Sequence, residues 1–434
     1  MSLSPRLLIL AGLLAIAAAA AQWAGDSAWR QAWLFPAGLL VLLVAVELLL
    51  TSRYRFALSR VTPSAVELGR ELTLGYQLRV LPARRFSLEL AEALPAQLSE
   101  MQWQARFEMP NEGVLAFERP LTALSLGEMQ FNTLQARVLG VFGLVWWRRT
   151  LPAAARTCVV PQSLTQAERR QFTRAQGEVA QQRSVGQGLE LIAIRDYQAG
   201  DPPRSIDWKA SARSGNELKV RVLSVDQNLE LTILLDVGRR SRLVTGQMRR
   251  LDHYVNLCSR LAQVALSAND TVHVLAYAQH PVAELYHLRG QRGIQRLHRT
   301  LSGLSVQAGD SDPSAAASVV LRRLPRRTLL VCLGDTESPP TVQSLLRALH
   351  LLRRKHLPLV ACLDDPELLA LTRAQSDHWR APARLLAAQE LLHAQHAANT
   401  KLRSMGAIIV SADPEHLDAR VLGAYADLRR RRAV

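Results

Sequence analysis

The sequence contains few cysteines and few aromatic residues. Aromatic residues make up 5% of the chain, and the four cysteines are spread at wide intervals. No C-x-x-C pair and no histidine at metal-ligand spacing accompanies them, so a zinc site or a disulfide framework is not expected. Free, mostly buried thiols in a reducing compartment are the simpler interpretation. The four residues are Cys158, Cys258, Cys332 and Cys362.

Motifs of nucleotide hydrolysis and of common hydrolases are also missing. The sequence has no G-x-x-x-x-G-K-[ST] loop, no G-x-S-x-G elbow and no H-E-x-x-H. His393 and His396 lie three apart in a helical stretch, but without a third ligand a solvated helix face is the simpler interpretation. The sequence therefore predicts no catalytic residues, and any nucleotide chemistry belongs to a partner.

The chain carries an excess of positive charge. It has 53 Lys and Arg against 37 Asp and Glu in 434 residues, a formal net charge of +16, which favours acidic partners. The basic residues are not interleaved with stacking aromatics, so no nucleic-acid partner is expected. An anionic inner-membrane lipid surface is the simpler explanation, because each basic side chain held near it gains about 1 kcal/mol. Arg429 to Arg432 fit such a surface or a solvated helix end.

Two apolar runs near the N-terminus predict two transmembrane helices. They cover about residues 7–24 and 32–50, each close to the ~20 residues that a helix needs to cross hydrocarbon. A cleaved signal peptide is the alternative for the first run, because Arg6 precedes it and small residues end it. Glu47 lies near the end of the second run, where its cost is small enough to be tolerated. Positive residues after this run predict a cytoplasmic location for the rest of the chain; they are Arg53, Arg55 and Arg60.

The remaining sequence changes its pattern several times. Residues 53–160 alternate apolar and polar positions between turn-like segments, which predicts a β-sandwich. Residues 161–188 are rich in Gln and Arg and predict a linker, followed by a charged segment over 189–225. From 226 to 434, buried-strand runs alternate with amphipathic helical stretches. This alternation predicts an α/β domain with a doubly wound, mostly parallel sheet, in which ligand sites form at the carboxyl ends of the strands.

The segment "GLELIAIRDYQAGDPPRSIDWKASARSGNELKVR", Gly188 to Arg221, resembles the signature of the DUF58 family. The resemblance covers most of the chain and includes the "FGL" element, Phe142 to Leu144, at the end of the sandwich. It implies two N-terminal membrane spans and, after the signature, a domain similar to the von Willebrand factor A fold. It also implies a partnership with MoxR-type AAA+ ATPases, as an adaptor or in assembling other complexes, and no enzymatic activity.

The resemblance further implies a place for a divalent cation at the carboxyl ends of the strands. Such A domains bind the ion through an Asp-x-Ser-x-Ser loop, a later hydroxyl and a later Asp, and hard ions such as Mg²⁺ prefer these oxygen ligands. Here the two serine positions hold Gly238 and Arg240, so we expect no cofactor, although Mg²⁺ stays an alternative. The remaining candidate ligands are Asp236, Ser311 or Ser314, and Asp335. Ion pairs of the two carboxylates with Arg239 or Arg240 are the alternative to a metal.

The charged signature is a poor candidate for acid–base catalysis. Carboxylates beside so many guanidinium groups have depressed pKa values and stay ionised near neutrality. Arginine favours bidentate pairing, while the apolar residues suit packing and the Gly and Pro residues suit a tight turn. We therefore expect a latch between the sandwich and the α/β domain, part of which faces a partner. Its residues are Arg195, Tyr197, Gly200, Asp201, Arg204, Ile206, Asp207, Trp208, Lys209 and Arg213.

Together these patterns predict a multi-pass protein of the bacterial inner membrane with cytoplasmic domains. Its expected role is that of a non-catalytic, membrane-tethered adaptor or scaffold that works with a MoxR-type AAA+ ATPase. The alternative is a metal-dependent A-domain module that binds a ligand or a protein. If the ion pairs of the signature are buried, removing Asp207 or Arg213 costs about 3–5 kcal/mol.

Overall fold

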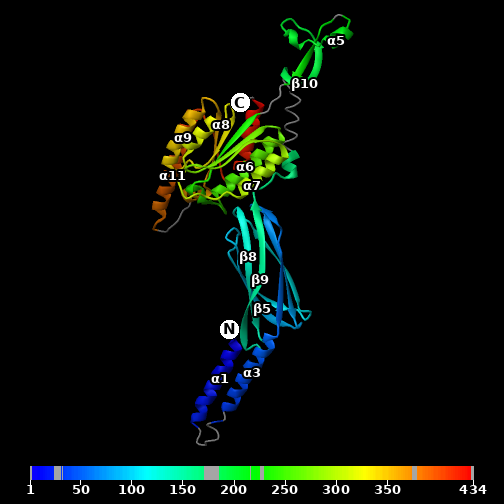
Figure 1. The fold of residues 1–434 in the computed structure, drawn as a ribbon. Helices are drawn as coiled ribbons and strands as arrows, with labels where there is room; N and C mark the ends of the chain where they lie inside the picture. Colours follow the sequence, from blue (N-terminus) through cyan, green and yellow to red (C-terminus); the bar gives the residue numbers. More distant parts are fainter. Residues whose placement is uncertain are drawn as a thin grey trace. The chain divides into compact units, whose positions relative to one another are not determined.

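The computed structural model shows a multi-domain chain with a sheet-rich N-terminal part (Figure 1). It describes residues 2–23, 31, 33–170, 185–215, 217–224, 229–373 and 379–431. The chain divides into two compact units, residues 1–160 and 161–434. The first unit contains two apolar helices and the β-strands predicted for residues 53–160, and the second contains the signature segment and the α/β domain.

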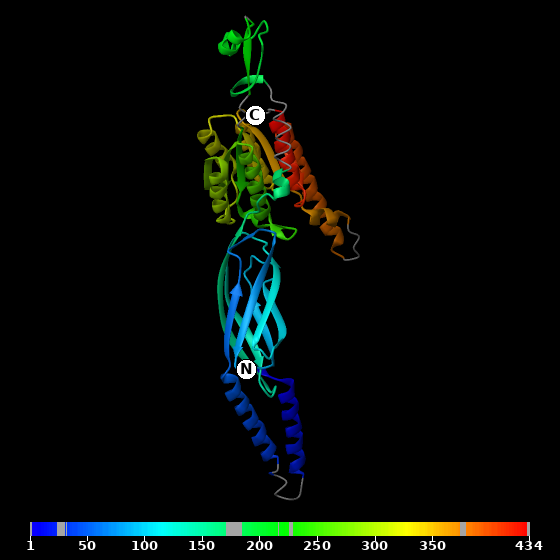
Figure 2. The same cartoon turned by 90° about the vertical axis from the view of Figure 1, so that its right-hand side faces the viewer.

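The first unit begins with helices α1 (Pro5–Gln22) and α3 (Leu34–Ser52), which extend side by side from one end of its strands (Figures 1 and 2). Within the described residues, α3 is the one helix that is long and apolar enough to cross a membrane, and α1 is apolar over Pro5–Ala21. Both helices pack on the start of strand β9 (Val145–Val160), where Trp147 is buried. The helical pair is thus joined to the β-strands by apolar contacts.

Glu47 has a structural role that its place in an apolar run did not reveal. Its side chain is fully buried on α3, and its Oε1 atom accepts a hydrogen bond from the backbone N–H of Leu144 at 3.2 Å. A Cβ atom at Gly140 would lie only 1.9 Å from this oxygen. Glycine at 140 therefore lets the carboxylate approach the turn that precedes β9, and Glu47 ties α3 to that turn.

The strands of the first unit form two sheets. One is six-stranded with the order β1-β9-β8-β5-β6, and β3 also pairs with β9; the other is three-stranded with the order β2-β4-β7. The strands not yet defined are β1 (Ser2–Leu3), β2 (Arg55–Val61), β3 (Ala65–Glu67), β4 (Glu71–Leu81), β5 (Phe86–Ala93), β6 (Gln102–Met109), β7 (Val114–Thr122) and β8 (Gly127–Leu139). Burial alternates strictly along β4, as expected for a strand with one face on the core.

A charged group lies inside this sandwich-like unit. The side chains of Arg60 on β2 and Glu92 on β5 are each 1% exposed and form an ion pair, and the Tyr76 hydroxyl on β4 donates to Glu92 at 2.7 Å. The Arg60 guanidinium also lies 4.8 Å from the centre of the Phe131 ring. Arg60 is therefore held in the core, although its position after the apolar run suggested a free positive charge at the cytoplasmic end of the second apolar segment.

The second unit contains a six-stranded sheet with the order β16-β15-β12-β17-β18-β19. All neighbouring strands are parallel except the antiparallel edge pair β15 and β16. The strands are β12 (Glu230–Asp236), β15 (Thr271–Tyr277), β16 (Pro281–Leu288), β17 (Leu329–Leu333), β18 (Leu357–Leu363) and β19 (Ile408–Ala412). The chain order reverses between β12 and β17, so a topological switch point lies there.

Helices cover both faces of this sheet (Figure 1). On one face, α8 (Pro313–Arg323), α9 (Pro339–Leu352) and α11 (Ala381–Ser404) share an apolar core with the strands. The other helices are α6 (Arg250–Ser267), α7 (Gly290–Ser302), α12 (Leu417–Arg430) and the short α10 (Pro366–Arg373). Both faces of the central strands are thereby buried, which explains their continuous apolar runs.

The first residues of the predicted linker belong to this unit. The backbone N–H groups of Gln162 and Leu164 donate to side chains of α6, Asn256 and Gln263, at 3.0 Å each. Glu168 forms an ion pair with Arg260 of the same helix. The chain from 161 to about 168 is thus packed on α6, while the predicted linker residues 171–184 lie outside the described residues.

His356 gives the second unit a dependence on pH. Burial lowers its pKa to about 4, against about 6.5 in an unfolded chain. Between pH 6.5 and pH 4 the unfolded state therefore binds more protons than the folded state. The contribution of neutral His356 to the free energy of unfolding is fully present above pH 6.5 and is lost as the pH falls toward 4. When the pH falls from 7 to 5, we expect the free energy of unfolding to decrease by about 2 kcal/mol less in the His356→Asn variant than in the wild type. Urea unfolding at the two pH values measures this, and an unchanged pH profile would contradict it; His350→Gln, at an exposed site on α9, is the control.

Candidate functional site

The signature segment folds into a small substructure of its own. Strands β10 (Val185–Asp196) and β11 (Lys219–Ser224) pair antiparallel, and a 3-10 turn (Pro203–Ser205) and helix α5 (Trp208–Arg213) connect them. The apolar side chains of Ile206, Val220 and Val222 are buried. An isolated two-stranded hairpin is marginally stable by itself.

The turn at Gly200 explains several residues of the signature. The N–H of Asp201 donates to the carbonyl of Gln198 at 3.0 Å, and Gly200 has a φ of 111°, which favours glycine. Arg195 then binds the Asp201 carboxylate with both Nη atoms, at 2.7 and 2.6 Å. This hydrogen bond lowers the pKa of Asp201, so the carboxylate stays ionised, as expected of a pair that fixes a turn.

Asp207 acts as the N-cap of α5. Its Oδ1 atom accepts hydrogen bonds from the backbone N–H groups of Lys209 and Ala210, both at 3.0 Å, and its own N–H donates to the carbonyl of Lys219. Asp207 is half-buried and Arg213 is exposed. The cost of 3–5 kcal/mol expected for buried pairs therefore does not apply to these two residues, because removing either side chain leaves no fully buried charge without a partner.

Replacement of Asp207 by alanine is expected to destabilise the signature segment by about 1 kcal/mol, the usual cost of losing an N-cap. Hydrogen exchange at the amides of Lys209 and Ala210 measures this directly, since both lose their acceptor. Asp207→Ser preserves a capping oxygen and is expected to retain most of the protection. Equal exchange in the alanine and serine variants would contradict the capping role.

Large apolar side chains of the segment are exposed. Trp208 is 67% exposed and Tyr197 39% exposed, although residues of this size are usually covered. Leu191, Ile194 and Leu218 are also exposed. Among its side chains that the structure describes, the segment thus displays more large apolar residues than it buries, and it is suited to contact another surface.

In the described part of the segment, the acidic side chains are paired, whereas several of the basic side chains are not. Each of the four carboxylates in residues 191–224 has a partner: Asp196 and Glu217 bind Lys219, Asp201 binds Arg195, and Asp207 caps α5. Within the described residues, the basic side chains that remain form no ion pair; they are Arg204, Lys209, Arg213 and Arg221. The free charge that the segment offers is therefore positive.

The second candidate site lies at the switch point of the large sheet. Asp236 ends β12 and is buried, and its Oδ1 atom accepts from the N–H of Gly238 at 2.8 Å and from the Ser311 hydroxyl. Burial raises the pKa of Asp236. Ser314 lies elsewhere, with its hydroxyl bonded to Ser344. The structure thus brings together Asp236 and Ser311, which the sequence proposed as ligands.

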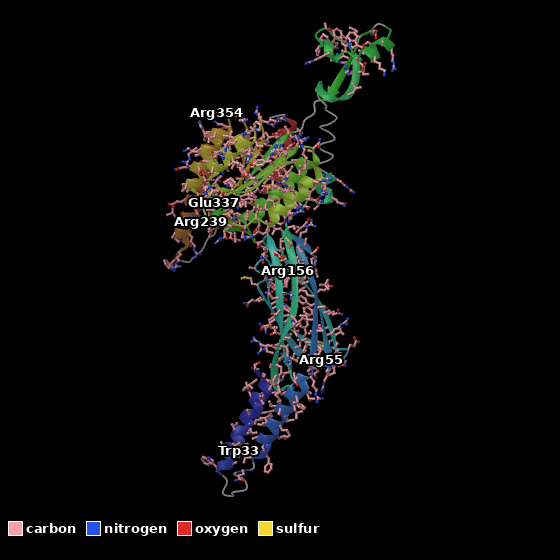
Figure 3. All side chains as sticks on the ribbon, in the orientation of Figure 1. Trp33, Arg55, Arg156, Arg239, Glu337 and Arg354 are labelled. Carbon is pink, nitrogen blue, oxygen red and sulfur yellow. The ribbon has the colours of Figure 1, made fainter. Side chains whose placement is uncertain are left out.

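Asp335 follows β17 and binds two arginines. Its carboxylate contacts Nε of Arg240 and lies 3.3 Å from Nη1 of Arg250. Arg250 is 3% exposed and also binds Glu337 at 2.8 Å, and Figure 3 shows Glu337 at this edge of the unit. Arg239 instead pairs with Asp310 at the surface. Of the proposed ion pairs, the structure contains the one between Arg240 and Asp335.

These residues do not fit a divalent cation. A Cβ atom at Gly238 would lie 2.1 Å from the Ser311 hydroxyl, so the loop has no room for the serine that would supply a ligand. The guanidinium of Arg240 contacts the carboxylate of Asp335 that a cation would need, and it would repel the ion. The described residues contain no cluster of three or more His, Cys, Asp or Glu side chains that could hold a metal.

Sequence reasoning missed three residues of this site. Arg250 begins α6, and Glu337 follows Asp335 by two positions. Tyr254 on α6 is buried, donates to the carbonyl of Gly334 at 3.0 Å and accepts from the N–H of Leu363 at 3.1 Å. The acidic pair after β17 was a signal for Glu337, whereas nothing local in the sequence indicates Arg250 or Tyr254.

Solved structures show only distant similarity to this chain. A CARDB domain from Pyrococcus furiosus has 9% identity and a TM-score of 0.19, with 24% of this chain and 93% of that chain covered. A β-glucuronidase from Bacteroides uniformis has 8% identity and a TM-score of 0.18 over 82% of this chain and 33% of that chain. The DNA glycosylase AlkC from Pseudomonas fluorescens has 15% identity and a TM-score of 0.15 over 34% and 42%. Similarities this low support no inference about the protein.

Comparison with curated proteins gives no match. A family described as "Protein of unknown function DUF58" matches residues 193–372. The matched region begins within β10, includes the exposed Trp208 and both carboxylates of the switch point, and ends within α10. This match supports the assignment of the chain to the DUF58 family.

Proposed function

We propose that this protein is a non-catalytic adaptor, tethered to the bacterial inner membrane, that works with a MoxR-type AAA+ ATPase in the assembly or activation of other protein complexes. In this proposal α1 and α3 both cross the membrane, and the soluble units lie in the cytoplasm beside anionic lipid. The ATPase supplies the nucleotide chemistry, and this chain supplies binding surfaces.

The observation that carries the proposal is the exposed signature segment. Trp, Tyr and Arg dominate the energetics of protein interfaces, and here Trp208 and Tyr197 are exposed beside arginines that have no carboxylate partner within the described residues. A surface of this composition favours a protein partner with an apolar pocket and an acidic rim. It supports adaptor function more directly than the switch-point carboxylates, which are already bound by neighbouring side chains.

The arrangement of the large sheet supports a von Willebrand factor A-like assignment for residues 226–434. The strand order with one antiparallel edge strand agrees with that assignment, as does the position of Asp236 and Asp335 at the switch point. In this proposal the ion pairs of Arg240 and Arg250 replace the metal that such domains often bind. The domain then binds proteins without a divalent cation.

Co-purification from membranes tests the adaptor proposal. The full-length chain is extracted in mild detergent, with and without a slowly hydrolysed ATP analogue, and the proteins that accompany it are identified by mass spectrometry. The proposal is supported if an AAA+ ATPase is recovered with the chain and if less of it is recovered when a peptide of residues 191–224 is added as a competitor. Recovery of no AAA+ ATPase in either nucleotide state would contradict it.

The alternative, a metal-dependent binding module, has a separate test. Calorimetric titration of the full-length chain with Mg²⁺ or Mn²⁺ is expected to give no heat beyond dilution, because Arg240 contacts Asp335 and Gly238 offers no hydroxyl. Saturable heat that disappears in an Asp236→Asn variant would instead favour the metal-dependent function.

A further inference from the structure

We propose that the free edge of β19 is a binding groove for an extended acidic peptide segment, which adds to the large sheet as a further strand. This inference goes beyond the adaptor function, because it uses a surface that contains no residue of the signature or of the switch point. It rests on three observations: the hydrogen-bonding pattern of the edge, the shape of the groove beside it, and the charge of its rim.

Strand β19 has a hydrogen-bonded neighbour on one side only within the described residues. It pairs with β18 in parallel register, and the carbonyl of Ala412 accepts from the N–H of Asp364 at 2.8 Å. Since successive residues of a strand direct their backbone groups to opposite sides, those of Ile409 and Ser411 point away from β18. The Ser411 carbonyl agrees with this, because it accepts from Nη1 of Arg420 at 2.9 Å.

A groove runs along this edge. Its volume is about 530 Å³, and it is lined by Ile409, Val410 and Ser411 of β19, Arg403 of α11, and Arg420, Gly423, Ala424 and Asp427 of α12. Because Gly423 and Ala424 have small side chains, α12 leaves space beside β19, and the backbone of another segment can approach the strand there. Figure 2 shows α11 in orange and α12 in red on either side of this region. Bare strand edges of this kind readily pair with another chain.

The rim of the groove is basic. Arg403 and Arg420 are exposed, and within the described residues neither forms an ion pair. Asp427, which is the acidic residue of the lining, is already paired with Arg430. A ligand with carboxylates at positions that reach the two arginines therefore complements the rim, whereas a basic ligand is repelled.

The occupant that fits these features is an extended peptide with alternating acidic and apolar residues. Its backbone would pair with Ile409 and with the N–H of Ser411. Because its side chains alternate between the two faces of the sheet, its apolar side chains would rest on the half-buried Ile409, and its carboxylates on the opposite face would meet Arg420, with Arg403 adding to the positive charge of the rim. The short length of β19, five residues, limits the added strand to a similar length.

Fluorescence anisotropy with the full-length chain in detergent tests this inference. The probe is a fluorescein-labelled peptide of alternating glutamate and valine, about eight residues long, to cover a strand of typical length. The Arg403→Glu/Arg420→Glu variant is expected to bind it about tenfold more weakly. The matched control, Arg322→Glu/Arg323→Glu, makes the same change of net charge on α8, at exposed positions outside the groove, and is expected to leave the affinity unchanged.

Two further peptides separate strand addition from simple charge attraction. A peptide of the same sequence with N-methyl groups on alternate residues, placed to block the pairing edge, is expected to lose binding, because it cannot form the ladder. A lysine and valine peptide is also expected not to bind. Equal affinity of the N-methylated peptide, or equal loss in the α8 control variant, would overturn the proposal.

A change of oligomeric state would overturn it as well. If the charge reversal at the groove converted a self-associated chain into monomers in sedimentation velocity, the occupant would be a second copy of this chain and not an acidic peptide. Competition by phosphatidylglycerol vesicles in place of the peptide would assign the groove to lipid. The co-purification result for the AAA+ ATPase does not affect either outcome, so the two proposals fail independently.

Discussion

Replacement of Trp208 by alanine is expected to weaken binding of the proposed AAA+ partner by about 2–4 kcal/mol, which is roughly 30- to 1,000-fold in affinity. Among the described large apolar side chains of the signature segment, Trp208 is the most exposed, at 67%. A tryptophan that enters a pocket of the partner loses this exposure on binding, and its truncation leaves a cavity there. The affinity of the co-purified ATPase for the wild-type and variant chains, measured by biolayer interferometry, gives the number.

A matched tryptophan elsewhere provides the control for this prediction. Trp379 is 77% exposed and lies outside the signature segment, so Trp379→Ala is expected to leave partner affinity unchanged. The latch hypothesis gives a different result for Trp208→Ala: a lower melting temperature of the chain with no change in partner affinity. Because the two measurements are independent, they decide whether Trp208 packs on this chain or on a partner.

Regular periodicity made most of the secondary structure predictable. Alternating apolar positions in residues 71–81 correspond to β4, and the continuous apolar run that ends at Asp236 corresponds to β12. One exception is β16 (Pro281–Leu288), which was not anticipated; strands β10 and β11 and helix α5 of the signature segment were not anticipated either. The burial pattern of β16 is irregular, and half of its positions are exposed, because an antiparallel edge strand receives neighbours on one side only. Its sequence therefore resembles a loop.

The switch-point site was partly predictable, because topology brings certain residues together. Asp236 and Asp335 follow neighbouring parallel strands, whose carboxyl ends meet at one edge of the sheet. Arg250 could not be placed in the same way. It reaches the site from the start of α6, 85 residues before its partner Asp335, and only the packing of that helix on the sheet determines the contact. Helix register against a sheet is a tertiary property that no local pattern records.

The ion pair inside the first unit shows the same limit for single charges. Arg60 and Glu92 are 32 residues apart and lie on strands of different sheets. In the sequence, Arg60 resembles the other basic residues that follow an apolar run, so it was counted with Arg53 and Arg55. Those two arginines are exposed in the structure, so of the three they alone supply the free positive charge on which the prediction of a cytoplasmic location rests.

Replacement of Glu92 by alanine is expected to destabilise the first unit by about 3–5 kcal/mol, the usual cost of a buried charge that loses its partner. Within the described residues, Nε and Nη1 of Arg60 have no hydrogen-bond partner, so Glu92 is the acceptor that compensates burial of the guanidinium. Tyr76 loses its acceptor as well. The wild-type and variant chains are compared by urea unfolding in detergent, followed by tryptophan fluorescence, to which Trp103 contributes from its place beside Tyr76.

The double variant Arg60→Met/Glu92→Leu tests whether the loss of stability in Glu92→Ala comes from the unpaired charge of Arg60. Because it removes both ions and fills their volume with apolar groups, its free energy of unfolding is expected to be within about 1–2 kcal/mol of the wild type or higher. If the double variant were as unstable as Glu92→Ala, lost packing or the Tyr76 hydroxyl that loses its acceptor in both variants, and not an unpaired charge, would be the cause. In the proposed membrane topology, the double variant is also expected to retain the orientation of the chain in cysteine-labelling experiments, because Arg60 is buried. Reversal of the exposed Arg53 and Arg55 to glutamate is instead expected to disturb that orientation, because positive charge beside a membrane helix favours the cytoplasmic side.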